Sequence, residues 1–369
     1  MVASLYFHIP FCQKKCPYCH FFVLPNKTKD RELFTSALLK EWQLRLPLFK
    51  DLEIPSLYFG GGTPSLHPEV IEEILKRASS LKLSSDVEIT VEANPEHVTS
   101  SLVKRLKKHG VNRFSLGVQS LDDSLLKVLG RSHSKDKAVQ AIQTIYDAGI
   151  ENITIDLMNE LPHQTLESWN RTLDEVDHLP ITHLSLYNLT FEKNTIFTKN
   201  ENKLRPYLPS EEVCVAMHTI AAEKLEKIGL KQYEISAFAK EGYEAIHNTG
   251  YWTGRPFLGL GPSAFSYFEG KRFQNCCHLK RYSDKLQEGK DPIDFEETLP
   301  HDKSLHERLA IHLRLFQGVN LNDFPLRASG INILKSLVED GFLKFDGDTV
   351  CLTSQGRLFY DTVAERIIL

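Results

Sequence analysis

Three cysteines stand close together near the start of the chain, at Cys12, Cys16 and Cys19. Iron–sulfur clusters are held by cysteine thiolates, and a cubane [4Fe–4S] cluster has four irons. Three cysteines can hold three of these irons, which leaves the fourth iron open to a ligand that is not protein. The C-x3-C-x2-C spacing therefore favours a [4Fe–4S] cluster with one open iron.

A structural zinc site is the alternative for the same three cysteines. Zinc takes four protein ligands, and His8 or His20 could complete the set. A zinc knuckle usually has two C-x2-C pairs, however, and this chain has no second pair. The remaining cysteines are Cys214, Cys276, Cys277 and Cys351. An odd, uneven set in a chain of 369 residues does not predict a disulfide framework.

The composition is that of an ordinary globular protein, with 41% hydrophobic and 25% charged residues. The net charge is -4, so no bulk positive field predicts a nucleic-acid partner or an anionic membrane. No apolar run reaches membrane-spanning length, and the first residues lack the basic region of a secretory signal. We therefore expect a cytoplasmic protein, with membrane contact that is peripheral at most.

Short apolar runs alternate with amphipathic segments from residue 4 to about residue 230. The expected strands are 4–10, 56–59, 87–91, 113–118, 152–157 and 183–189. The expected helices are 30–46, a helix beginning at Pro68, 102–109, 122–129, 136–148, 166–178 and 211–227. Six strand–helix units predict a parallel sheet with helices outside, and near-continuous apolar strands indicate burial of both faces. Because no G-x-G-x-x-G follows the first strand, a partial (β/α)6 barrel fits better than a dinucleotide fold.

The regular alternation ends after residue 230. A strand is expected within 233–238, followed by segments rich in glycine, proline and aromatic residues at 247–252 and 257–263. From Lys303 a helix, a hairpin that turns at Asp346 and Gly347, and a last helix at 354–368 form a winged-helix-like pattern. The expected fold is thus α/β, with a barrel at 1–232, a linker or α+β region at 233–302 and a winged-helix-like end at 303–369.

Polar residues recur near the ends of the expected strands. A glycine-rich turn, Gly-Gly-Gly-Thr-Pro at 60–64, leaves the second strand, and glycines let a backbone approach a ligand closely. Glu92, Gln119, Arg131 and Asp156 stand near later strand ends. Each alone is more often a capping or surface residue. In barrel enzymes this face carries the site, so their recurrence favours a bound ligand.

The cysteine motif with an aromatic residue at Tyr18, placed after the first strand of an expected barrel, resembles that of the radical S-adenosylmethionine (SAM) superfamily. The resemblance implies that the methionine part of SAM chelates the open iron and that one-electron reduction cleaves SAM to a radical. The whole chain is similar to the oxygen-independent coproporphyrinogen III oxidase (HemN) family and its HemW-type haem chaperone branch. The matching segments are 6–12, 60–65, 91–95, 115–120, 184–187 and 352–357. The SAM-site positions implied by this resemblance are Tyr6, Tyr18, Gly61, Gly62, Thr63, Glu92, Gln119, Arg131 and Asp156.

Two differences from the oxidases favour the HemW-type branch. The oxidases have a further cysteine two residues after the third, where this chain has Phe21, and they carry a long extension before the first strand. The branch motif H-N-x-x-Y-W is present at 247–252, and its His247 is the expected axial ligand of haem, unless it only caps a loop. Asn159 and Glu160 replace an aromatic residue and a glycine that the family usually has.

The resemblance implies a function in porphyrin metabolism. The chain is expected to bind a [4Fe–4S] cluster, SAM and haem, and to pass haem to an acceptor protein that the sequence does not identify. An electron donor is needed if SAM is cleaved, and whether the chain is an enzyme stays open. The alternatives are oxidative decarboxylation of coproporphyrinogen III and a zinc-stabilised winged-helix protein that binds DNA.

Overall fold

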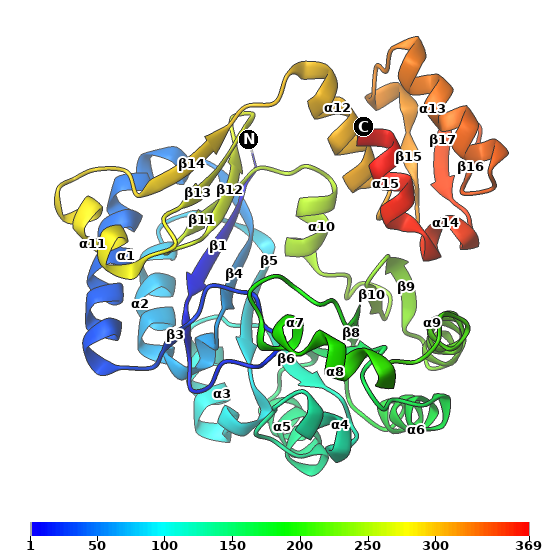
Figure 1. Ribbon diagram of the computed structural model, residues 1–369. Helices are drawn as coiled ribbons and strands as arrows, with labels where there is room; N and C mark the ends of the chain where they lie inside the picture. The colour runs from blue at the N-terminus through cyan, green and yellow to red at the C-terminus, as the bar shows by residue number, and fades with distance from the viewer. Residues whose placement is uncertain (1, 369) are drawn as a thin grey trace.

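The computed structural model describes residues 2–368, and its centre is a curved sheet of six parallel strands (Figure 1). These strands are β1 (Ser4–Ile9), β4 (Glu53–Gly61), β5 (Lys82–Ala93), β6 (Arg113–Gln119), β7 (Asn152–Asn159) and β8 (His183–Asn188). They lie side by side in chain order, and each pair is parallel. The predicted partial (β/α)6 barrel is therefore confirmed.

Helices cover the outer face of this sheet. They are α1 (Thr28–Phe49), α2 (Pro68–Ala78), α3 (Ser100–Lys108), α5 (Lys135–Asp147), α6 (Leu166–Val176) and α9 (Glu211–Lys227). A further short helix, α4 (Asp123–Val128), packs instead at the carboxyl end of the strands, in a cluster with Tyr18 and Met158. The predicted end of the first helix at residue 46 is wrong, because α1 continues through Pro47 to Phe49. Phe49 is fully buried and packs its ring edge-on against Trp42 at 5.1 Å, and this contact holds the last turn.

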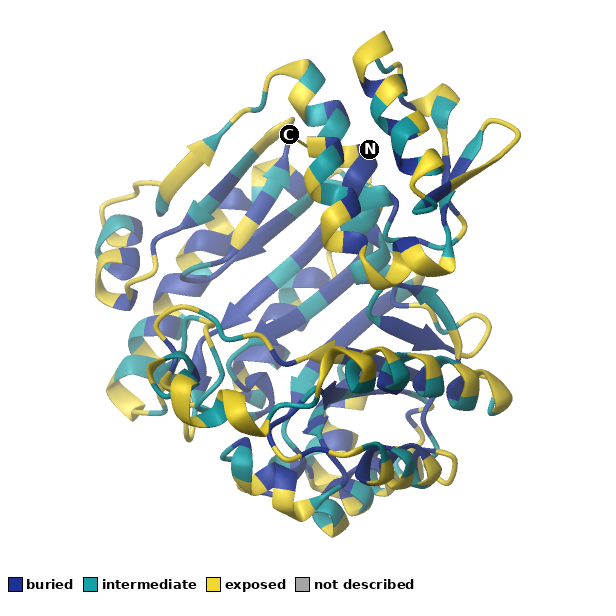
Figure 2. Cartoon of the chain, turned by 45° about the vertical axis from the view of Figure 1, so that its right-hand side comes forward, coloured by how far each residue is buried: buried dark blue, intermediate teal, exposed yellow. Residues whose placement is uncertain are grey.

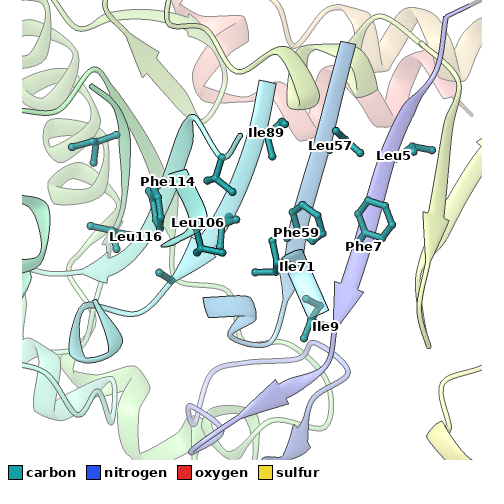
Figure 3. Packing of buried hydrophobic residues seen from close by; sticks show 14 of the residues in the cluster. Leu5, Phe7, Ile9, Leu57, Phe59, Ile71, Ile89, Leu106, Phe114 and Leu116 are labelled. Atoms are coloured by element: carbon teal, nitrogen blue, oxygen red, sulfur yellow. The ribbon is translucent and has the colours of Figure 1, made fainter. Parts of the chain in front are cut away.

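Side chains of the barrel strands alternate between an apolar outer face and a polar inner face. Leu5, Phe7, Leu57 and Phe59 point together toward the covering helices (Figure 3). The side chains between them point into the barrel lumen and include Ser4, Tyr6, His8, Ser56, Tyr58, Glu88, Thr90, Glu92, Arg113, Ser115, Thr154, Asp156, His183, Ser185 and Tyr187. The expectation of near-continuous apolar strands is therefore wrong. Both faces of the strands are buried, but the inner face consists of polar side chains that form hydrogen bonds with one another.

Residues 231–297 add strands to both edges of the barrel sheet. β9 (Lys231–Glu234) and β10 (Ala237–Ala239) extend the edge beyond β8, and β11 (Phe257–Leu260) pairs in parallel with β1. β12 (Phe265–Phe268), β13 (Lys271–Asn275) and β14 (Ile293–Glu297) follow as antiparallel neighbours. Two helices, α10 (Ile246–Trp252) and α11 (Leu279–Gln287), interrupt this segment. The residues expected to form a linker or α+β region thus share one sheet with the barrel, and the three-part division of the chain stays a prediction.

The last part of the chain forms a smaller α+β unit beside the barrel (Figure 1). Its elements are α12 (His301–His312), β15 (Val319–Asn320), α13 (Ala328–Glu339), β16 (Leu343–Asp346), β17 (Thr349–Leu352), α14 (Ser354–Leu358) and α15 (Tyr360–Ile368). The three strands form their own sheet, and the unit has its own apolar core around Leu309, Leu334 and Val350. The winged-helix-like pattern is confirmed, although the last helix is divided at Phe359.

Most residues of the barrel strands are buried, whereas exposed residues lie mainly on helices and loops (Figure 2). Along residues 2–368, no helix has the length and apolar character needed to cross a membrane.

Candidate functional site

The three cysteines lie on one loop at the carboxyl end of β1. Two short strands, β2 (Phe11–Cys12) and β3 (Leu24–Pro25), pair in parallel and bracket this loop. Cys12, Cys16 and Cys19 are free and partly exposed. A second segment holds the loop from outside: the N–H of Phe197, in α7 (Ile196–Lys199), donates to the carbonyl of Pro17 at 3.1 Å. α8 (Glu201–Leu204) follows directly in this segment.

Two side chains, one following β4 and one following α4, direct polar donors at the cysteine loop. The Thr63 hydroxyl lies 3.5 Å from Cys12 Sγ, and Arg131 Nη1 lies 3.3 Å from Cys16 Sγ. Asn94 joins these two donors, since its Oδ1 accepts from Arg131 Nη2 at 2.6 Å and its Nδ2 donates to Thr63 Oγ1 at 3.1 Å. Asn94 was not among the predicted site residues. Its position two residues after Glu92, at the same strand end, is the signal that could have identified it.

This donor set fits a [4Fe–4S] cluster. Cysteine thiolates and cluster sulfides accept hydrogen bonds, and such bonds orient the ligands and tune the cluster. Thr63 and Arg131 already aim donors at two of the three sulfurs. The Nε of Arg131 is buried without a hydrogen-bond partner, so the guanidinium keeps a donor for a further acceptor. The loop could therefore hold such a cluster through Cys12, Cys16 and Cys19.

The glycine-rich turn joins β4 to its neighbours at the same end of the barrel. Gly61 has φ +110°, which a side chain would strain, and a Cβ on Gly62 would lie 2.6 Å from the carbonyl oxygen of Phe11. The N–H groups of this turn are occupied within the protein: Gly61 donates to Glu92 Oε2 at 3.1 Å and Gly62 to the Ile9 carbonyl at 2.9 Å. An ammonium group only donates hydrogen bonds, so such a group of a ligand would use carbonyl oxygens of the turn.

Two carboxyl groups, Glu92 and Asp156, face the lumen from β5 and β7. Glu92 accepts a hydrogen bond from the hydroxyl of Tyr58 at 2.9 Å. Tyr58 was not predicted from the sequence, although it alternates with apolar neighbours along β4. Burial, and then the nearby charge of Asp156, raise the pKa of Glu92 to about 7. Burial raises the pKa of Asp156 to about 6. A ligand that brings hydroxyl donors or positive charge would stabilise both carboxylates.

Gln119 and Tyr6 also belong to the part of the lumen nearer the cysteine loop, which we call the cofactor end. Gln119 has φ +67°, which is uncommon for a residue with a side chain and typical of functional sites. Its amide lies over Gly117, where a Cβ would come within 3.0 Å of Gln119 Nε2 and 3.4 Å of Arg131. The Tyr6 hydroxyl bonds His8 Nδ1 at 3.0 Å, and its ring stacks on Tyr58 with centroids 6.0 Å apart.

All nine predicted SAM-site residues lie on the cysteine loop or on strands and turns of the barrel, and most have contacts that connect them. Tyr18 packs edge-on against Phe197 with centroids 6.1 Å apart, which ties the cysteine loop to α7. Their binding of SAM stays a prediction. The fit rests on the unpartnered Arg131 Nε, the glycine turn without side chains and the two carboxyl groups of raised pKa.

His247 lies elsewhere, in α10, among the side chains at the amino ends of the strands. It is 1% exposed, and both ring nitrogens are bonded: Nδ1 to the Ser56 hydroxyl at 2.9 Å and Nε2 to the Tyr251 hydroxyl at 2.8 Å. Burial, followed by the charges of Arg255 and Arg113, lowers the pKa of His247 to about 3. Haem ligation by His247 stays a prediction, and it would require a ring nitrogen to give up its hydrogen bond and become accessible.

The two residues that depart from the family pattern interact with a helix. Glu160 has φ +59°, a conformation that favours the glycine usual at this position. Its Oε1 lies 3.0 Å from His218 Nε2 in α9, and the same ring nitrogen lies 3.2 Å from the Asn159 amide. The loop after β7 therefore keeps a turned conformation and replaces the glycine with a polar contact.

Comparison with known protein families identifies two matching segments. Residues 6–176 match the radical SAM superfamily, and residues 299–359 match the HemN C-terminal domain. The first segment contains every predicted cysteine ligand and SAM-site residue, and the second lies in the winged-helix-like unit.

Curated relatives match along nearly the whole chain. The heme chaperone HemW of Bacillus subtilis (strain 168) is 34% identical over 98% of this chain and 98% of its own length. The mitochondrial radical S-adenosyl methionine domain-containing protein 1 of Danio rerio is 31% identical over 100% of this chain and 87% of its own. Among solved structures, coproporphyrinogen III oxidase (HemN) of Escherichia coli superposes with a TM-score of 0.86 at 24% identity, covering 99% of this chain and 89% of that one. This last likeness shows the fold.

Proposed function

This chain belongs to the HemW family of radical SAM proteins, and from that premise we propose that it binds haem and delivers it to an acceptor protein. The observation that carries the proposal is the match, at 34% identity over 98% of both chains, to a protein named heme chaperone HemW. The chain keeps the three cysteines and the polar lumen that a cofactor of this superfamily needs.

A [4Fe–4S] cluster is the resident cofactor in this proposal, held by Cys12, Cys16 and Cys19. When bound with SAM, such a cluster supplies one-electron reduction of the sulfonium. The protein supplies position and shielding from water. Thr63 and Arg131 donate toward the cluster sulfurs, and the apolar packing of Tyr18 against α7 holds the cysteine loop in place.

The SAM site in this proposal is the cofactor end of the lumen. Glu92 would accept hydrogen bonds from the ribose hydroxyls, because each carboxylate oxygen, which already accepts one bond from Tyr58 or Gly61, has a further lone pair. Arg131 pairs with the methionine carboxylate, and carbonyl oxygens of the turn that contains Gly61 and Gly62 accept from the ammonium. Gln119 and Asp156 would bond the ribose or adenine edge, and Tyr6 would line the same site.

Haem, an acceptor protein and an electron donor are the proposed partners. The acceptor is unidentified, and the donor is needed only if SAM is cleaved rather than bound. We place the protein in the cytoplasm, in line with its charge and with the absence of a membrane-spanning helix along residues 2–368. Whether it catalyses a reaction or only carries haem is open in this proposal.

The two alternative functions are not favoured. The oxidase has a fourth cysteine where this chain has Phe21, and the matching HemN structure shares the fold at 24% identity. A zinc-stabilised DNA-binding protein does not explain the match of residues 6–176 to the radical SAM superfamily.

Haem titration of the purified chain, run beside a coproporphyrinogen III assay, tests the proposal. We expect saturable haem binding with a defined Soret band and no vinyl product when SAM and a reductant are added under anaerobic conditions. Absence of saturable haem binding would overturn the chaperone function. Formation of vinyl product would establish the oxidase instead.

A further inference from the structure

The amino end of the barrel lumen is closed by α10, which lies between the barrel and the C-terminal unit (Figure 1). The first two N–H groups of α10 donate to one buried carboxylate. Glu88 Oε2 accepts from Ile246 at 2.9 Å, and Glu88 Oε1 accepts from His247 at 3.1 Å. Glu88 also pairs with buried Arg113 at 3.8 Å. These contacts attach the start of α10 firmly to β5 and β6.

Arg255, just beyond the end of α10, folds back along the helix. Its guanidinium donates to the carbonyl of Ile246, the first residue of α10, and lies directly against Gly250, where any Cβ would collide with it. Gly250 of the H-N-x-x-Y-W motif is therefore needed for packing, and a shift of α10 along its axis would break the contacts with Glu88 and Arg255.

His247 is the residue by which α10 reaches the inner face of the sheet. Its Nδ1 bonds the Ser56 hydroxyl, which in turn donates to Ser4 at 2.9 Å. Its imidazole lies 4.9 Å, centroid to centroid, from the ring of Tyr58 and is tilted by 31°. His247 therefore fixes both the hydroxyl of Ser56 and the ring of Tyr58 on the same strand, β4.

Tyr58 connects this end of the lumen to the cofactor end. Its hydroxyl donates to Glu92 Oε1 at 2.9 Å, and Glu92 Oε2 accepts the N–H of Gly61 at 3.1 Å. Between His247 and the Glu92 carboxylate there is only one intervening side chain. A displacement of the imidazole would remove one of the two ring contacts of Tyr58, leaving that with Tyr6, and would weaken the bond from Tyr58 to the carboxylate.

We propose that His247 is a positioning residue for the SAM site: it holds Tyr58 so that the Tyr58 hydroxyl donates to Glu92. This inference rests on the proposed function in one respect, the assignment of Glu92 to the SAM ribose. It gives the histidine of the H-N-x-x-Y-W motif a role that its buried, doubly bonded ring can fulfil without any movement of α10.

The Tyr58–Glu92 bond provides a readout that a general loss of stability would not change. The groups that face Glu92 are Tyr6 from β1, Tyr58 from β4, Arg113 from β6, Asp156 from β7, Tyr187 from β8 and Tyr251 from α10. Donation from Tyr58 stabilises the ionised form of Glu92. If that bond weakens, Glu92 ionises at higher pH, and the pH at which SAM affinity is half-maximal should rise.

The experiment measures SAM affinity against pH by equilibrium dialysis of radiolabelled SAM with the anaerobically reconstituted full chain. The variants are His247→Gln and Tyr58→Phe, with Glu92→Gln as reference and His178→Gln, an exposed histidine, as matched control. The same variants are titrated with haem and their Soret bands recorded. Tyr251→Phe, which removes only one hydroxyl, serves as a second test at His247 if the glutamine variant fails to fold.

We expect His247→Gln and Tyr58→Phe to weaken SAM binding at pH 7 by about threefold to tenfold, a range that corresponds to the net contribution of one ordinary hydrogen bond. Both should move the pH midpoint upward, while His178→Gln matches wild type and all Soret bands stay in place. If the pH midpoint of SAM affinity shifts in Tyr58→Phe but not in the His247 or Tyr251 variant, the positioning role of His247 is overturned while the proposed function stands. A Soret band displaced by His247→Gln overturns it in favour of haem ligation. If Glu92→Gln leaves SAM affinity unchanged, the assignment of Glu92 fails and the positioning role fails with it.

Discussion

The two ends of the barrel lumen are built from the same kinds of residue but differ in how their hydrogen bonds are used. At the cofactor end, Arg131 keeps a buried N–H without a partner, and Glu92 and Asp156 have pKa values raised to about 7 and about 6. At the α10 end, His247 bonds through both ring nitrogens and Glu88 accepts two backbone N–H groups, although Arg113 and Arg255 keep an unpartnered Nε there as well. The clearest difference is therefore between the carboxyl groups of raised pKa at one end and the doubly bonded histidine at the other.

This difference indicates that the cofactor end is suited to bind a ligand, whereas the α10 end is a closed part of the structure. Polar groups buried with spare donors and with disfavoured charges cost free energy, which a ligand can recover by pairing with them. Polar groups that already satisfy one another hold a fixed geometry and gain nothing from a ligand. Residue type alone would assign a histidine to the ligand site, whereas the hydrogen bonds assign His247 to the closed end.

Loss of a cluster ligand should give the largest effect and act at the cofactor end alone. We expect Cys16→Ser to reduce iron after reconstitution from about four per chain to below one, because two thiolates hold a cubane poorly. Iron and sulfide analysis measures this. The apo chain should unfold at nearly the wild-type urea concentration, since Cys16 is partly exposed. Cys277→Ser, at an exposed cysteine, is the control, and equal iron in the two variants would contradict the assignment.

Glu88→Gln should produce the converse result at the α10 end. Removing this charge leaves buried Arg113 without its ion pair, a change that costs about 3 kcal/mol in the free energy of unfolding. Urea unfolding of the apo chain measures the loss, and cluster iron should stay near wild type. Glu167→Gln, which breaks an exposed pair with Arg171, should have no measurable effect. If Glu88→Gln lost cluster iron without a loss in the free energy of unfolding, the two ends of the lumen would not have the separate roles described above.

The raised pKa of Glu92 predicts how apo stability depends on pH. Since its pKa is about 7 in the folded chain and near 4.5 in the unfolded chain, the folded state binds more protons between these values. The free energy of unfolding should therefore fall as pH rises from about 5 to about 7.5, with Asp156 acting in the same direction. Glu92→Gln should make this decline shallower in urea unfolding at a series of pH values. An unchanged slope would contradict the raised pKa.

The smallest effect is expected where α10 meets the C-terminal unit. The guanidinium of Arg314 lies 4.2 Å from the centre of the Trp252 ring and also pairs with Glu234 at 3.2 Å. Trp252→Phe keeps an apolar ring but weakens the cation–π contact, so we expect a loss of about 0.5–1 kcal/mol in urea unfolding. Tyr207→Phe, at an exposed tyrosine, is the control. SAM affinity should not change in Trp252→Phe. A marked change would mean that the contact between Trp252 and Arg314 influences the cofactor site.

Much of the barrel was predictable because its signals are local. The helix predicted at 211–227 agrees with α9 at both ends, and the six strands occur where apolar runs predicted them. The cysteines, the glycine turn and the strand-end residues were also identified from spacing. The inner polar face was missed, although Tyr58 and Ser185 alternate with buried apolar residues, because short apolar runs are read as buried on both faces.

By itself, the sequence determined which chemistry the chain can hold: three thiolates on one loop, a turn that only glycine permits and carboxylates at successive strand ends. These depend on residue type and on distances along the chain. Only the tertiary structure decided the partners of groups far apart in sequence, such as the Asn94 amide between Thr63 and Arg131. It also placed β11 beside β1 and His247 at the closed end of the lumen. Hydrogen-bond partners between distant segments leave no periodicity in a sequence, so they are set only when the sheet closes.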